Sequence, residues 1–320
     1  MNKILITGAS GFVGSHLVEY LNSLESYEIF GTAFGHGNAT TKSLLDSDHL
    51  ISLNLLDNQE TERIVLEIKP NYVVHLAALS SPAKSKIDPL KTISNNVGIS
   101  VNLLEAISKL DKKPTTLIIG SAEEYGLVNQ DQIPIDENTP LNPCNPYAVS
   151  KITQDYLALQ YFNSHKIPII RLRPFNHTGE RRPPTFVLPA FAQQLAQIEQ
   201  GKKEYLKVQG DLEVTRDFTD VKDMVRAYEL ALHKCTPGEV YNIGSDKGVL
   251  ISDLLNMILS NSDTQIRVEK DPAKQGSSNI KALISNSQKF RQATGWSPEI
   301  PLEDTVARVV NYWREFKKGE

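Results

Sequence analysis

The sequence predicts an α/β protein in which a doubly wound parallel sheet is joined to a smaller, interleaved α/β domain toward the C-terminus. In the first half of the chain, short apolar runs alternate with longer amphipathic segments. This alternation favours a parallel sheet, because parallel neighbours need a crossover connection between them. The chain has 320 residues, of which 40% are hydrophobic and 22% are charged. It can therefore bury a large core.

Apolar runs predict the strands, and apolar residues at helical spacing predict the helices between them. The expected strands are, in chain order, Lys3–Thr7, Glu28–Phe34, Leu50–Leu53, Tyr72–Leu76, Thr116–Ile119, Pro168–Leu172 and Glu239–Ile243. The clearest expected helices are Ser15–Leu24, Ile87–Leu110, Tyr147–Ser164 and Val221–His233.

The alternation loosens beyond Pro174, which indicates a change of domain. Asp271-Pro272 and the segment Gly295–Pro298 then separate the last helical stretches. We predict a larger domain made of residues 1–175 and 217–246, and a smaller one made of residues 176–216 and 247–320.

Charge and cysteine content exclude several classes of protein. The formal net charge of −4 argues against a strongly cationic nucleic-acid binder. Cys144 and Cys235 are too few for a disulfide scaffold or a cysteine-based metal site. No apolar stretch approaches the roughly 18 residues needed to span a membrane. We expect a cytoplasmic protein without a metal, a membrane or a nucleic-acid partner.

A glycine-rich turn follows the first strand. Thr7-Gly8-Ala9-Ser10-Gly11-Phe12-Val13-Gly14 leads directly into an amphipathic run. Glycines at this spacing let the backbone turn sharply and bring its N–H groups and the helix N-terminus close to a pyrophosphate. An ordinary tight turn is the alternative, but the strand before and the helix after favour a dinucleotide site at Gly8, Gly11 and Gly14.

The end of the second strand bears on which dinucleotide is bound. An acidic residue there selects NAD, and a basic one accepts the extra phosphate of NADP. The run Gly31–His36 carries no carboxylate, which favours NADP. His36 either contacts that phosphate or lies in a solvated turn.

A tyrosine and a lysine open a predicted helix near the end of the fifth strand. Asn145 and Pro146 form a helix-start signal. Tyr147 and Lys151 follow at i, i+4, so the ammonium lies near the phenol and stabilises its anion. Such a pair also arises by chance, but here it faces the strand end that carries Ser121, and doubly wound sheets bind ligands outside the carboxyl ends of their strands.

Together these features resemble the extended short-chain dehydrogenase/reductase family, in its nucleotide-sugar branch. The matching segments are Thr7–Gly14, Asn54–Asp57, His75–Ala78, Asn96, Ser121, Tyr147–Lys151 and Arg173–Gly179. The resemblance implies a Rossmann fold, NADP or NAD as cofactor, and a nucleotide-sugar substrate. It also implies at least a homodimer, formed as a four-helix bundle by the helices Ile87–Leu110 and Tyr147–Ser164.

The resemblance also implies roles for individual residues. Tyr147 would exchange a proton with the sugar 4-oxygen, Ser121 would orient that oxygen, and Lys151 would bind the nicotinamide ribose and lower the pKa of Tyr147. Further cofactor contacts would come from Gly8, Gly11, Phe12, Val13, Gly14, Leu55, Leu56, Leu76, Ala77, Ala78 and Asn96. Substrate contacts would come from Ser121, Ala122, Glu123, Asn176, Arg181, Arg182 and Arg216.

Within this branch, the sequence motifs are most similar to those of the GDP-4-dehydro-6-deoxy-D-mannose reductases. The shared segments are Gly120–Gly126, Arg173–His177 and Glu213–Val221. The implied reaction is hydride transfer from NAD(P)H to a C4 ketone, with Tyr147 protonating the alkoxide and a product of the GDP-rhamnose type.

One segment departs from the reductase pattern. Residues 271–278 contain one lysine and no arginine where those reductases carry an arginine-rich stretch that holds the nucleotide. Arg181 and Arg182 are the candidates to replace it, in a segment that is similar to the GDP-mannose 4,6-dehydratases. A solvated charge pair is the alternative for these two arginines.

Other functions stay open at the level of sequence. A GDP-mannose 4,6-dehydratase is the second possibility, because dehydratases place the carboxylate that removes the C5 proton at the position of Glu123, which reductases share. A nucleotide-sugar 4-epimerase with the same Ser121, Tyr147 and Lys151 is the third. A non-catalytic dinucleotide sensor is least favoured. His75, His177 and Cys144 are expected to be structural.

Overall fold

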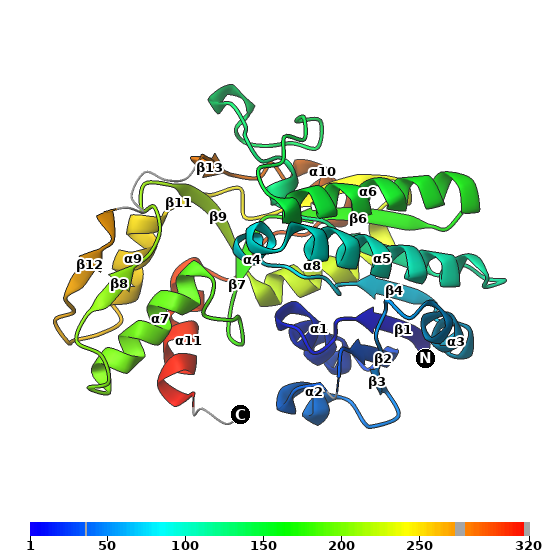
Figure 1. Ribbon diagram of the computed structural model, residues 1–320, viewed down its shortest axis with the longest axis horizontal. Helices are drawn as coiled ribbons and strands as arrows, with labels where there is room; N and C mark the ends of the chain where they lie inside the picture. The colour runs from blue at the N-terminus through cyan, green and yellow to red at the C-terminus, as the bar shows by residue number, and fades with distance from the viewer. Residues whose placement is uncertain (36, 273–278, 317–320) are drawn as a thin grey trace.

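The computed structural model describes residues 1–320 except 36, 273–278 and 317–320. The interpretations of His36 and of the segment Lys274–Ser278 fall outside the described residues. Figure 1 shows two lobes. The larger one contains the main sheet and its covering helices, and the smaller one contains α7, α9, α11, β8 and β12.

A seven-stranded parallel sheet forms the larger lobe, as the sequence predicts. Its strand order is β10-β6-β5-β4-β1-β2-β3, so the connections reverse direction between β1 and β4, where such sheets bind ligands. The strands are β1 Asn2–Thr7, β2 Tyr27–Ala33, β3 Leu50–Ser52, β4 Tyr72–His75, β5 Thr115–Ile119, β6 Ile169–Pro174 and β10 Val240–Ile243. The predicted fold class is therefore confirmed.

Helices cover both faces of this sheet because each buries an apolar face against it. Two hydrophobic clusters result, one between the sheet and α1 and α8, and the other between the sheet and α3, α5 and α6. The helices of this lobe are α1 Phe12–Ser23, α2 Ala39–Leu44, α3 Asn58–Ile68, α4 Pro82–Ile87, α5 Pro89–Ser108, α6 Pro146–His165, α8 Val221–Lys234 and α10 Gln288–Thr294.

The helix predicted at Ile87–Leu110 begins two residues later than expected. Asp88 ends α4 and also caps α5, accepting a hydrogen bond from the Lys91 N–H at 3.0 Å. Pro89 then occupies the first turn of α5, where its missing N–H costs nothing. The predicted helix is thus α5, and the separate short helix α4 precedes it.

The smaller lobe has its own sheet and core. Four strands, β7 Asn176–Thr178, β9 Thr215–Asp220, β11 Gly248–Leu250 and β13 Ala282–Leu283, form one sheet, and β8 Leu206–Val208 pairs with β12 Val268–Lys270. Helices α7 Val187–Glu199, α9 Ile251–Leu259 and α11 Leu302–Glu315 pack a separate hydrophobic cluster. Two short 3-10 turns, η1 Ala122–Glu124 and η2 Gln130–Gln132, lie in the loop after β5.

The chain passes between the lobes more than once. Strand β9 belongs to the smaller sheet, whereas α8, which follows it directly, packs against α1 in the larger lobe. The predicted domains are interleaved in this sense, and their boundaries remain a prediction. None of the helices in the described part of the chain is long and apolar enough to cross a membrane.

Candidate active site

The glycine turn after β1 packs so tightly against nearby backbone that side chains at its glycines would clash. Gly8 has a φ of +73°, and a Cβ on it would lie 2.9 Å from the backbone N of Ala77. A Cβ on Gly14 would overlap the Gly8 carbonyl oxygen. The Gly11 N–H donates to that same carbonyl at 3.0 Å, and α1 begins immediately afterwards. The loop therefore fits a dinucleotide pyrophosphate at a helix N-terminus.

Buried hydrogen bonds hold the neighbouring strand ends. His75 Nδ1 lies 2.7 Å from Thr7 Oγ1, and His75 Nε2 lies 2.9 Å from Ser100 Oγ. Burial, and then Lys151, lower the pKa of His75 to about 3, so the ring is neutral. Asn96 is also buried and accepts from the Leu79 N–H at 2.8 Å. These two side chains shape the site, in agreement with the structural interpretation of His75.

The other predicted cofactor contacts lie along the same edge. Leu76, Ala77 and Ala78 directly follow β4, next to the glycine turn. Leu55 is buried in the core, whereas Leu56 is 47% exposed. Leu56, not Leu55, thus presents an apolar surface outside the strand ends.

Ser121, Tyr147 and Lys151 come together at the end of β5. Asn145 caps α6, accepting from the Ala148 N–H at 2.9 Å, and this cap directs Tyr147 from the first turn of the helix toward Ser121. The Ser121 side chain lies close enough to the Tyr147 phenol to favour its anion. Lys151 Nζ donates to the Ile119 carbonyl at 2.7 Å and lies 5.9 Å from the centroid of the Tyr147 ring.

The electrostatics of the tyrosine differ from the expectation. Burial raises the pKa of Tyr147 well above its usual value, and the hydrogen bond from Ser121 and the charge of Arg182 only partly oppose this. Burial also lowers the pKa of Lys151 to about 8. The phenol is therefore protonated at neutral pH, which suits a proton donor, and burial keeps the net pKa of Tyr147 above its usual value although the Lys151 ammonium is near.

Glu123 lies beside this group. Its Oε2 accepts a hydrogen bond from Asn145 Nδ2 at 2.9 Å, and its backbone N–H donates to Ser121 Oγ at 3.2 Å. Its charge also contributes to the raised pKa of Tyr147. A carboxylate, a phenol and a hydroxyl thus lie together beyond the carboxyl end of β5.

The two neighbouring arginines have different environments. The Arg182 guanidinium carbon lies 4.1 Å from the centroid of the Phe186 ring and 5.6 Å from that of Phe12, which begins α1. Burial lowers its pKa to about 10, and its Nε has no hydrogen-bond partner among the described residues. Arg181 instead pairs with Glu19 and bonds to His16 on α1. Arg182 Nε is thus a buried donor without a described partner, whereas residues of α1 engage Arg181.

Two of the remaining predicted substrate residues, Asn176 and Arg216, lie in the sheet of the smaller lobe. Arg216 on β9 is half-buried and donates to the carbonyls of Thr215 and Ile280 at 2.8 and 3.0 Å. Asn176 opens β7, which pairs with β9. Ala122 is buried behind Ser121. The predicted substrate residues are therefore divided between the two lobes.

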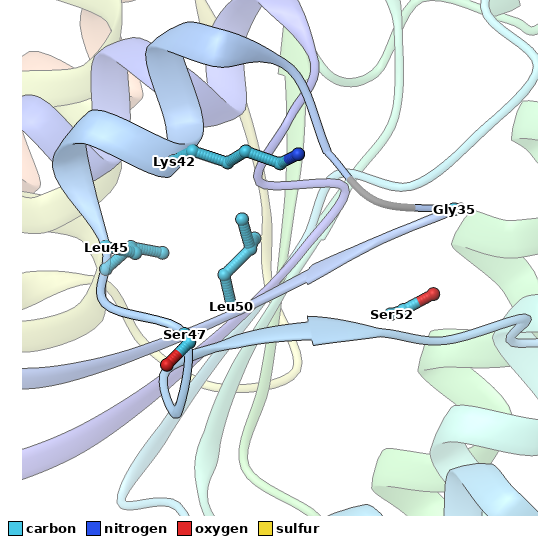
Figure 2. A pocket seen from close by; sticks show the side chains of 6 residues that line it. All are labelled: Gly35, Lys42, Leu45, Ser47, Leu50 and Ser52. Carbon is cyan, nitrogen blue, oxygen red and sulfur yellow. The ribbon is translucent and has the colours of Figure 1, made fainter.

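A cavity of about 390 Å³ contains a lysine that the sequence analysis missed. It is lined by Gly35, Lys42, Leu45, Ser47, Leu50 and Ser52, and Figure 2 shows the Lys42 ammonium directed toward Gly35, just beyond β2. Asn38, the cap of α2, donates to the Ser10 carbonyl at 2.8 Å and so ties this segment to the glycine turn. The sequence signal for this lysine was a basic residue in the short helix after β2, whereas the prediction considers only the end of the strand itself.

A parallel sheet with a glycine cradle after β1 and a Ser-Tyr-Lys group after β5 defines a dinucleotide-dependent oxidoreductase of the short-chain dehydrogenase/reductase class. A family model described as GDP-mannose 4,6 dehydratase matches residues 5–309. The chain belongs to this family.

Individual relatives carry different activities. The chain is similar to a GDP-6-deoxy-D-mannose reductase from Pseudomonas aeruginosa, with 31% identity over 99% of both chains. It is also similar to a UDP-glucose 4-epimerase from Streptococcus mutans, with 29% identity over 99% of this chain and 98% of that one. A GDP-mannose 4,6-dehydratase from Vibrio cholerae is 28% identical over 96% of this chain and 92% of its own length.

Solved structures agree with the fold and the cofactor. The structure of RMD from Pseudomonas aeruginosa complexed with NADPH superposes with a TM-score of 0.87 and 29% identity, covering 98% of this chain and 99% of that one. The chain is an NAD(P)-dependent nucleotide-sugar oxidoreductase of the extended short-chain dehydrogenase/reductase type. The predictions of enzyme class and cofactor are confirmed.

Proposed function

We propose that the enzyme reduces the C4 ketone of a GDP-linked 6-deoxy-4-keto sugar of the GDP-4-dehydro-6-deoxy-mannose type, giving a GDP-rhamnose-type product. The observation that carries this proposal is the buried, protonated Tyr147 beside Ser121, since a ketone reductase needs a proton donor at that place. The full-length similarity to a GDP-6-deoxy-D-mannose reductase supports the same substrate.

The residues of the chain divide the work of the reduction. Bound NADPH supplies the hydride. The Ser121 hydroxyl orients the ketone oxygen, and Tyr147 donates its proton to that oxygen as the carbon is reduced. The Lys151 ammonium, 5.9 Å from the ring centroid, then stabilises the phenolate that remains until a proton from solvent replaces the one lost.

The nucleotide diphosphate is assigned to residues of both lobes. Arg182 is the first candidate because its Nε lacks a partner among the described residues and its guanidinium lies near Tyr147. Arg216 and Asn176 contribute from β9 and β7. Arg181 is less suited, because Glu19 and His16 already engage its guanidinium.

The cavity beside β2 supports NADPH as the preferred cofactor. Lys42 reaches into it from α2, and Ser52 lines it at the end of β3 (Figure 2). A cation at this strand end is suited to the 2′-phosphate that distinguishes NADP from NAD. We assign that phosphate to Lys42.

The dehydratase activity is the second candidate. It is favoured by one observation, the Glu123 carboxylate beside Tyr147, where a base could remove the C5 proton. Epimerase relatives share the fold, but no residue of the described site favours that activity over the other two.

The active enzyme is proposed to be a cytoplasmic homodimer. Helices α5 and α6 pack side by side and leave Leu90, Val149 and Tyr156 on the surface, exposed to 77%, 40% and 57%. Two copies of this pair would bury these side chains in a four-helix bundle.

The decisive experiment follows NADPH and NADH absorbance when the enzyme is given GDP-4-dehydro-6-deoxy-mannose. A parallel reaction with GDP-mannose is analysed for a new 4-keto product. Oxidation of one NADPH per ketone is the expected result. A keto product from GDP-mannose without cofactor consumption would instead establish the dehydratase.

A further inference from the structure

A buried carboxylate lies directly behind Ser121. Glu124 ends the turn η1 and has no exposed surface. Its Oε1 accepts a hydrogen bond from the Ser121 backbone N–H at 2.7 Å. Its Oε2 lies 3.0 Å from Nε of Arg173 on β6. Glu124 thus links the loop that carries Ser121 to the neighbouring strand.

Gly120 makes room for this carboxylate. A Cβ on Gly120 would overlap Oε1 of Glu124 and would lie 3.0 Å from the Leu172 carbonyl oxygen. The glycine therefore allows Glu124 to pack against the end of β5, at the point where Ser121 begins the next segment. A change in the position of the carboxylate is transmitted to Ser121 through the backbone hydrogen bond.

Arg173 is itself fixed on its far side. Its Nε donates to Asp155 Oδ2 at 2.9 Å, and its Nη1 donates to the Tyr125 hydroxyl at 3.1 Å. That hydroxyl donates in turn to Asn242 Oδ1 on β10 at 2.7 Å. All of these side chains are buried, so Glu124 rests against a rigid partner.

Glu124 also interacts electrostatically with the ammonium of Lys151. Burial and then the charge of Asp155 raise the pKa of Glu124 to about 8, whereas Arg173, the Ser121 N–H and Lys151 favour its ionised form. Conversely, burial lowers the pKa of Lys151, and Glu124 opposes that shift. Each group therefore stabilises the charged form of the other.

We propose that Glu124 is a positioning residue for the reaction. Through the Ser121 backbone it fixes the hydroxyl that orients the ketone, and in its ionised form it supports the Lys151 ammonium. This inference rests on the proposed function, which gives Ser121 and Lys151 their roles. Glu124 acts only through these two residues.

Two substitutions separate the contributions of geometry and charge. Glu124→Asp keeps a carboxylate but is one carbon shorter, so it loses the Ser121 N–H. We expect kcat to fall about tenfold with an unchanged KM for the sugar and an unchanged pH profile. Glu124→Gln removes the charge, so we expect the basic limb of the pH profile to move to lower pH, because Lys151 then loses its proton more readily.

A matched control is Glu199→Gln. Glu199 is bound by Arg314 at 2.7 and 2.8 Å in the smaller lobe, so its loss should lower the melting temperature and leave kcat and the pH profile unchanged. Wild-type kcat and pH profiles in both Glu124 variants would overturn the proposal.

Two further measurements show whether a variant has failed to fold and whether the proposed function itself is wrong. Circular dichroism and cofactor binding show whether each variant is folded, and if Glu124→Gln is not, the kcat of Glu124→Asp decides alone. If wild-type enzyme converts GDP-mannose and does not reduce the ketone, the proposed function is wrong. The same variants are then measured on the reaction that the wild type catalyses, and the same losses are expected.

Discussion

Burial and hydrogen bonding act in opposite directions on the phenol of Tyr147. Burial raises its pKa, while the Ser121 hydroxyl and the Arg182 guanidinium favour the anion. The balance keeps the proton on the phenol in the free enzyme. Proton transfer then becomes favourable as negative charge develops on the substrate oxygen, which is when a general acid is needed.

Replacement of Tyr147 by phenylalanine removes the proton donor and keeps the ring. We expect kcat to fall about 100-fold or more, with the Kd for NADPH unchanged when measured by fluorescence titration. Tyr205→Phe, in the smaller lobe, is the control and should keep wild-type turnover. Near-normal turnover of the Tyr147 variant would contradict the assigned mechanism.

The pH dependence of turnover should follow Lys151. Burial lowers its pKa to about 8, so its ammonium is present below that pH and is lost as the pH rises through it. Because the ammonium stabilises the phenolate, kcat should decline above about pH 8. A pH profile of kcat checks this, and a constant kcat up to pH 10 would exclude the assigned role of Lys151.

The residues of this site differ in how well sequence predicts them. Ser121, Tyr147 and Lys151 could be placed together because strand ends and a helix cap fix them locally. Arg181 and Arg182 could not be distinguished, because the separation depends on a left-handed turn at Arg181, with a φ of +67°. Glu124 was missed because its partner Arg173 is distant in sequence.

At the scale of single elements, the short helix α2 has the clearest functional consequence. Its cap, Asn38, binds the glycine turn, and its last turn carries Lys42 into the cavity beside β2. Since β3 pairs only with the last residues of β2, from Gly31 to Ala33, this cavity lies at the carboxyl end of the sheet.

We expect Lys42→Ala to weaken NADPH binding about tenfold and to leave NADH binding unchanged, because only NADPH carries the 2′-phosphate. Fluorescence titration with both cofactors measures the ratio. Lys112→Ala removes a lysine that lines another cavity, beside Asn71, and should alter neither constant. Equal loss of both affinities would assign Lys42 a different role.

Elements of the larger lobe were predicted more accurately than those of the smaller one. The seven predicted strands of the main sheet lie within a residue or two of the observed ones, because buried parallel strands are continuous apolar runs. In the smaller lobe, strands of two or three residues, such as β8 and β13, are set by pairing with distant segments and give no comparable pattern. The separation of α4 from α5 at Asp88 was not predicted, although Asp88 and Pro89 form the same kind of helix-start signal as Asn145 and Pro146.

At the scale of the whole molecule, the exposed face of α5 and α6 should hold two copies together. We expect the double variant Leu90→Asp/Tyr156→Glu to be monomeric, because it places four charges, two from each copy, in an otherwise apolar bundle. Light scattering should give twice the chain mass of 35.7 kDa for the wild type and that mass for the variant. Leu24→Asp, at the end of α1, should remain dimeric, and a monomeric wild type would exclude the bundle.

The position of β10 in the sheet affects how the chain folds during synthesis. This strand pairs with β6 at one edge of the main sheet, yet it is formed only by residues Val240–Ile243. After β6 and before β10, the ribosome must synthesise β7, α7, β8, β9 and α8, most of which belong to the smaller lobe. During that interval β6 is an unpaired edge of the sheet, with backbone groups open to pairing with another chain. The main sheet is therefore complete only when the last quarter of the chain is being translated.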